Sequence, residues 1–192
     1  NEGLVYNNIR FEFSDIDQAS AFATLFTGSN PCFSGIAGDK TFDFEKEKEV
    51  SILNDPEYLG NYTKENYSPK NLFSSTIGDE LKIASQGRSD VYSIAPDAES
   101  AILSAGHAAN GAFWMDNTNG KWATTTYYKG IPWYVDRYNN GPESLASRLE
   151  TMVWTPTLPM EKYDAFPYVL DDLPFRYTFS EKFANCYPNL KT

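Results

Sequence analysis

The order of strand-like and helix-like segments is the feature that most limits how this chain can fold. Residues 4–13, "LVYNNIRFEF", alternate as a strand does, and "QASAFATLF" (18–26) follows as a helix after a capping aspartate, Asp17. Later, a helical pattern over about 74–85 is followed by "RSDVYSIAP" (88–96), which reads as a short buried strand ending at Pro96. Strand–helix and helix–strand steps of this kind favour an α/β fold.

Glycine and proline mark the limits of the remaining elements. Gly28 predicts the end of the first helix, and "DAESAILSAGHAA" (97–109) predicts another short helix. "GAFWMDNTNGKWATTTYY" (111–128) predicts a hairpin of two aromatic-rich strands that turns at 117–120. Pro132 is expected at the first position of a helix over "PWYVDRYNN", and 142–154 predicts one more helix.

Two polar or proline-rich stretches are expected to be irregular. Residues 43–70 are rich in charge, tyrosine and turn residues, and they read as an excursion over the surface. The prolines at 156, 159, 167 and 174 exclude long helices near the end, so short strands and ordered loop are expected there. With no internal repeat and no linker, we expect a single domain over 1–192.

Charge excludes some classes of partner. Sixteen basic against 26 acidic residues give a net charge of −10, so a nucleic-acid or anionic-membrane surface is not expected. No apolar run is long enough to predict a transmembrane segment. The single histidine, His107, cannot form a histidine-rich zinc centre, and Cys32 and Cys186 lack metal-type spacing. Whether these cysteines are free or form a disulfide stays open.

Four segments in order carry a family resemblance: "ATLFTGSNPCFSGIAGD", "SPKNLFSSTIGDELKIAS", "VYSIAPDAESAILSAGHAANGAFWMDNTNGKW" and "VWTPTLPMEKY". Together they resemble the type I phosphodiesterase and nucleotide pyrophosphatase branch of the alkaline phosphatase superfamily, nearest to the bacterial threonine-dependent alkaline phosphatases. The resemblance implies a partial alkaline-phosphatase-like central sheet with flanking helices and an aromatic hairpin, within a longer domain. It also implies export to the periplasm or cell envelope.

In that family, the resemblance implies, phosphate esters are hydrolysed at a two-zinc site by a threonine or serine at a helix start. Helix N–H groups, an asparagine, a lysine and an arginine hold the phosphate oxygens. In this sequence the nucleophile position falls on Gln18, the asparagine on Asp39, the lysine on Asp97 and the arginine on Glu99. Glutamine lacks the required nucleophilic oxygen, and acids at the other three positions would repel a phosphate.

These departures predict that no catalytic residue is intact. Ser14 or Ser20 would replace the nucleophile only if the alignment slipped. The zinc ligands of the family fall outside this chain, so we expect no metal site or cofactor on it, although intact relatives would carry zinc. The alternative is a phosphatase or phosphodiesterase completed by residues outside the chain, and a third reading is a structural or interaction module.

Two further features allow a binding role. Phe113, Trp114 and Trp122 in the hairpin are expected to be cross-strand core rather than a stacking platform. Asp39, Asp97 and Glu99 would converge if the family geometry holds, and would then offer oxygen ligands to a cation. A small phosphorylated compound or another small ligand is the partner class considered, and the oligomeric state is left open.

Overall fold

The computed structural model describes residues 3–8, 10–14, 16–151, 168–170 and 173–175. It divides into two compact units, and each is described by itself. The first comprises residues up to Met115 together with Trp122–Ile131, and the second comprises Asp116–Lys121 and the residues from Pro132 onward. The expectation of a single domain stays a prediction.

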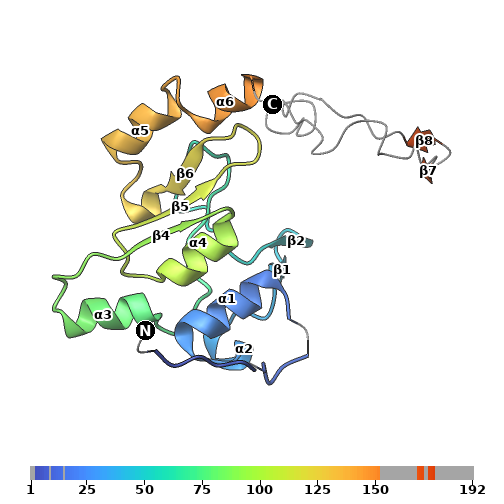
Figure 1. Ribbon diagram of the computed structural model, residues 1–192. Helices are drawn as coiled ribbons and strands as arrows, with labels where there is room; N and C mark the ends of the chain where they lie inside the picture. Colours follow the sequence, from blue (N-terminus) through green and yellow to red (C-terminus); the bar gives the residue numbers. More distant parts are fainter. Residues whose placement is uncertain (1–2, 9, 15, 152–167, 171–172, 176–192) are drawn as a thin grey trace. The chain divides into compact units, whose positions relative to one another are not determined.

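A mixed four-stranded sheet organises the first unit. Its strands are β3 (Gly60–Asn61), β4 (Tyr92–Ala95), β5 (Gly111–Met115) and β6 (Trp122–Thr125), in the order β3-β6-β5-β4. β4 and β5 are parallel and are joined through α4 (Ala98–Ala105), whereas β5–β6 and β3–β6 are antiparallel. The expected α/β class and aromatic hairpin are therefore present (Figure 1).

Helices α1 (Gln18–Thr27), α2 (Pro31–Ser34) and α3 (Ile77–Ala84) complete the larger part of this unit. α1 packs against α4, and α4 packs against β4 and β5. Small residues permit this close packing, because Ala19, Ala23 and Ala101 are fully buried beside Ile102 and Leu103. A separate hairpin is formed by β1 (Lys40–Asp43) and β2 (Lys48–Ser51).

The predicted limits of α1 are confirmed. Asp17 caps its N-terminus, and Gly28 ends it with a φ of 67°, in the left-handed region that glycine adopts at no steric cost. The helix expected over about 74–85 is α3, which begins after Thr76 rather than at Ser74. Thr76 and Asp79 form a reciprocal capping box that fixes that start.

Other expectations need correction. The described residues within 4–13 do not form a strand, and Leu4 and Val5 are 77% and 78% exposed. Within the described residues no strand pairs with this segment, so its alternation has no ladder to join. Strand β4 was expected to be buried, yet Tyr92 and Ile94 are 54% and 69% exposed because β4 is at the end of the sheet.

The stretch 43–70 is also more than a surface excursion. It supplies β3 to the sheet, and it buries Leu53 together with Asp55, whose carboxylate accepts the Ser68 hydroxyl at 2.6 Å. The hairpin aromatics Phe113 and Trp114 are 6% and 3% exposed, which confirms them as core.

The second unit contains α5 (Trp133–Asn139), α6 (Leu145–Thr151) and the antiparallel pair β7 (Tyr168–Leu170) and β8 (Leu173–Phe175). Pro132 was expected to be the first residue of this helix. It is instead the residue immediately before α5. The turn at 116–121 belongs to this unit, where Lys121 Nζ donates to Asn140 Oδ1 at 3.1 Å. No helix in the described parts of the chain is long and apolar enough to cross a membrane.

Candidate functional site

The start of α1 is fixed by Asp17, which links the helix to the glycine-rich loop after α2. Its Oδ1 accepts the Ser20 N–H at 2.7 Å, and its Oδ2 accepts the Asp39 N–H at 2.6 Å. Burial works to raise the pKa of Asp17, but hydrogen bonds from Ser20 and Asp39 outweigh it and hold that pKa below its usual value. Asp39 is thereby held beside the helix start.

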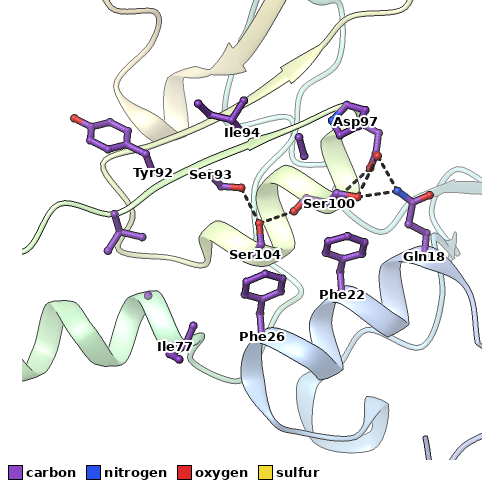
Figure 2. A pocket seen from close by; sticks show the side chains of 14 residues that line it. Gln18, Phe22, Phe26, Ile77, Tyr92, Ser93, Ile94, Asp97, Ser100 and Ser104 are labelled. Atoms are coloured by element: carbon purple, nitrogen blue, oxygen red, sulfur yellow. Dashed lines mark hydrogen bonds between the residues drawn. The ribbon is translucent and has the colours of Figure 1, made fainter. Parts of the chain in front are cut away.

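Gln18, the first residue of α1, connects two helix N-termini. Its Nε2 donates to Asp97 Oδ2 at 2.7 Å and to Ser100 Oγ at 2.7 Å (Figure 2). Asp97 in turn caps α4, because its Oδ1 accepts the Ser100 N–H at 2.8 Å. Both hydrogens of the Gln18 amide are therefore used in holding α1 against the start of α4.

Glu99 lies in the first turn of α4 and is half-buried. Burial raises the pKa of its carboxyl, and the nearby negative charges of Asp97, Asp39 and Glu65 raise it further. The acidic positions predicted from the sequence therefore lie close enough to repel one another.

The structure brings all four predicted positions together. Gln18 and Asp97 are in direct contact, Asp39 reaches the same helix start through Asp17, and Glu99 interacts electrostatically with Asp97 and Asp39. Within the described residues, none of the ion pairs involves Asp39, Asp97 or Glu99. The site thus offers an amide, hydroxyls and carboxylates, and its negative charge opposes an anionic ligand.

The two alternative nucleophiles do not fit the chemistry. Ser20 is fully buried, and its Oγ is 3.1 Å from the Asp17 N–H, from which it accepts a hydrogen bond. Ser14 is exposed and lies before the helix rather than at its start. Neither serine therefore lies exposed at the start of α1, where Gln18 stands.

The described residues do not fit a metal centre. Across the described ranges, no group of three or more histidine, cysteine, aspartate or glutamate side chains is arranged to hold a metal ion. Asp39, Asp97 and Glu99 therefore do not form the oxygen-ligand site considered from the sequence, and the part of the chain described offers no zinc-binding set.

His107 has a structural environment in the described part of the chain. Its Nε2 lies 2.7 Å from the Leu72 carbonyl oxygen, and its backbone N–H donates to Asp79 Oδ1 at 2.9 Å. Cys32 is exposed, whereas Cys186 lies outside the described residues, so their pairing stays untested.

Sequence reasoning missed Ser100 and Asp17 as parts of this site. Ser100 follows Asp97 by three positions, which is the spacing of a capping aspartate and the N–H it accepts, so a local signal existed. Asp17 was recognised only as a cap, and its second hydrogen bond to Asp39 depends on tertiary structure.

A groove of about 660 Å³ adjoins the site. One wall comes from Phe22 and Phe26 of α1, whose rings stack at a centroid distance of 6.0 Å. Other walls come from Ile77, from β4, and from Ser100 and Ser104 of α4 (Figure 2). Gln18 and Asp97 lie at the end of the groove where β4 finishes.

Three known proteins are similar to this chain in sequence, and two of them are named alkaline phosphatases. The alkaline phosphatase PafA of Elizabethkingia meningoseptica is 35% identical over 168 residues, which are 85% of this chain and 30% of that protein. The alkaline phosphatase PhoV of Synechococcus elongatus is 31% identical over 194 residues, 99% of this chain and 34% of that protein. A Myroides odoratus protein named calcium-transporting ATPase is 32% identical over 192 residues, which are 98% of this chain and 34% of that protein.

The fold agrees with these sequences. The crystal structure of wild-type PafA superimposes with a TM-score of 0.72 at 29% identity, covering 90% of this chain and 36% of that one. No family model matches the sequence. The chain is similar to alkaline phosphatases in sequence and in fold, and these relatives support a place in the alkaline phosphatase superfamily. It spans about a third of the length of the relatives it matches.

Proposed function

We propose that this chain is an alkaline-phosphatase-like domain of the type I phosphodiesterase branch that has lost phosphoryl transfer and serves as a binding or structural homologue. The family resemblance extends the proposal to a longer domain that contains residues 1–192 and to a location in the periplasm or cell envelope. The observation that carries it is the hydrogen bonding of Gln18 to Asp97 and Ser100.

The direction of these hydrogen bonds opposes catalysis. A nucleophile needs an oxygen that can lose its proton, and Gln18 instead donates from an amide nitrogen. Asp97 accepts the Ser100 N–H at the start of α4, so the position at which the resemblance expects a cationic phosphate donor carries a capping carboxylate instead. Loss of one such donor typically costs about 3–4 kcal/mol of transition-state stabilisation. Replacement of two cationic groups by acids adds repulsion to that loss.

A variant of the similar phosphatase supports the assignment of positions. A second PafA crystal structure carries substitutions at a threonine, an asparagine, a lysine and an arginine. The threonine and asparagine are separated by the same number of residues as Gln18 and Asp39. The lysine and arginine are spaced as Asp97 and Glu99 are. The agreement at both spacings supports the register on which the proposal rests.

A chimera tests the proposal against its alternative. This chain would replace the aligned third of the E. meningoseptica phosphatase, and hydrolysis of p-nitrophenyl phosphate and of a phosphodiester would be measured with added zinc. We expect turnover at least about a thousandfold below that of the parent, from the loss of the donors. A matched chimera with Gln18→Thr, Asp39→Asn, Asp97→Lys and Glu99→Arg should recover activity.

Robust zinc-dependent turnover by the unreverted chimera would contradict the proposal. It would favour the alternative, a phosphate-ester hydrolase whose zinc ligands lie outside this chain. Circular dichroism and thermal melting of both chimeras would establish that the comparison is between folded proteins.

A further inference from the structure

The end of α5 carries one of the three Asn–Gly dipeptides in the sequence, and the proposed function does not use it. The other two are Asn110–Gly111 and Asn119–Gly120. Such a pair can modify itself, because the glycine nitrogen can attack the asparagine side-chain carbonyl and no glycine side chain obstructs the approach. Gly111 and Gly120 are buried, whereas Gly141 is only partly buried and Asn140 is exposed. Access therefore favours reaction at Asn140.

A charged donor lies on the carbonyl oxygen of the Asn140 side chain. Lys121 Nζ donates to Asn140 Oδ1 at 3.1 Å, and both residues belong to the second unit. Attack on an amide carbonyl places negative charge on its oxygen, so a donor aimed at that oxygen lowers the barrier. Because the ammonium is charged, it stabilises that oxygen more than a neutral donor does.

The other two asparagines have neutral donors at the same atom. Asn110 Oδ1 accepts the Val91 N–H at 2.9 Å, and Asn119 Oδ1 accepts the Lys121 backbone N–H at 2.9 Å. The Gly120 nitrogen also donates within its turn, to the Asp116 carbonyl at 2.8 Å. Charge at the carbonyl oxygen thus distinguishes Asn140 from both.

The Asn140 side chain is held in place at a helix end. Its Nδ2 donates to the Asp136 carbonyl at 3.1 Å, and Asn140 is the residue that caps the C-terminus of α5. The Gly141 N–H donates to the Tyr138 carbonyl at 3.1 Å, and this bond must open before the nitrogen can turn toward the side chain. Terminal turns of helices open at a small free-energy cost, so this step is accessible in the folded chain.

We propose that Asn140 is a site of spontaneous deamidation, in which the Lys121 ammonium stabilises the side-chain carbonyl oxygen during attack by the Gly141 nitrogen. Hydroxide takes the Gly141 N–H proton, the nitrogen bonds to Asn140 Cγ, and the Cγ–Nδ2 bond breaks. Nδ2 takes a proton from water and leaves as ammonia, which regenerates hydroxide and leaves a cyclic imide. A second water opens the imide to aspartate or isoaspartate. The net reaction consumes one water and does not depend on whether phosphoryl transfer is lost.

The product changes the end of α5. A carboxylate replaces an amide that donated to the Asp136 carbonyl, so acceptor oxygens face one another there. Negative charge at a helix C-terminus is also unfavourable. Isoaspartate additionally lengthens the backbone by a carbon immediately after the helix.

Mass spectrometry of the whole chain tests the site. The chain is incubated in mildly alkaline buffer made with heavy-oxygen water and then digested, and peptide fragmentation assigns the amide-to-acid conversion to each asparagine. We expect Asn140 to convert at least about fivefold faster than Asn110 and Asn119. Conversion at either of these that equals or exceeds conversion at Asn140 would overturn the proposal.

Substitution of the donor tests its role. Because Lys121 is partly solvated, Lys121→Met should slow conversion at Asn140 by at least about threefold, less than loss of a buried donor would. Lys121→Arg keeps a charged donor and should remain within about twofold of the unaltered chain. Lys64→Met, at an exposed lysine of the first unit, is the matched control and should leave the rate unchanged. Unchanged or faster conversion with Lys121→Met would contradict the assigned role.

A second comparison does not depend on how the variants fold. In concentrated urea the three asparagines of the unaltered chain should convert at similar rates, and Lys121→Met should have no effect on Asn140. Persistence in urea of the faster conversion at Asn140, or of the Lys121 effect, would show that the folded arrangement is not its cause and would overturn the inference.

Discussion

Removal of the Gln18 amide should weaken the packing of α1 against α4 and lower the free energy of unfolding. Gln18→Ala deletes two hydrogen bonds of 2.7 Å, one to the Asp97 carboxylate and one to the Ser100 hydroxyl. A hydrogen bond to a charged group contributes about 1.5–3 kcal/mol and a neutral one about 1 kcal/mol. Because Gln18 is exposed and water can replace part of each bond, we expect a loss of about 1–2 kcal/mol in the free energy of unfolding.

Urea denaturation followed by tryptophan fluorescence would measure this loss. A double-mutant cycle with Asp97→Asn should give a coupling energy of about 0.5–1.5 kcal/mol, because the two side chains interact directly. Leu25→Ala on the same helix, at a side chain 63% exposed, is the control and should change stability by less than about 0.5 kcal/mol. A Gln18→Ala effect no larger than the control, with no coupling to Asp97, would refute the linkage of α1 to α4.

Three further substitutions test other parts of the account. Glu99→Gln should stabilise the fold at pH 7 and have little effect at pH 3. The pKa of the Glu99 carboxyl is raised in the folded state, so the stability of the unaltered chain falls as pH rises from the unfolded-state pKa toward the folded-state pKa. Equal effects of the substitution at both pH values would contradict this. Asp17→Ala should cost about 1 kcal/mol in urea denaturation at pH 7, and less as acid protonates Asp17, while Asp17→Asn should retain most of the cap. Gly106→Ala should lower the melting temperature, because φ is 73° there and an added Cβ would collide with Asp79 and Thr76; an unchanged melting temperature would show that the turn adapts.

Local signals predicted much of this fold. The cap at Asp17, the stop at Gly28 and the hairpin at 111–128 all follow from side chains that act on their own neighbours. The strand expected at 4–13 failed because a strand needs a partner, and alternation alone does not supply one. Burial of β4 failed for a related reason, since the apolar run does not reveal which strand ends the sheet.

The site was predictable in part. The resemblance placed Gln18, Asp39, Asp97 and Glu99, and the structure brings these four together. The sequence did not reveal that the Gln18 amide donates hydrogen bonds to Asp97 and Ser100, because these bonds depend on the packing of α1 against α4. The surrounding groove likewise depends on three elements distant in sequence.

The most direct test of the proposed loss of the phosphate site is a calorimetric titration of the chain with inorganic phosphate. We predict no saturable binding by the unaltered chain, since its acids oppose the anion and no cationic side chain stands at positions 97 and 99. The variant with Gln18→Thr, Asp39→Asn, Asp97→Lys and Glu99→Arg should gain saturable binding that weakens with added salt. Saturable binding of phosphate by the unaltered chain, equal to that of the variant, would contradict the account.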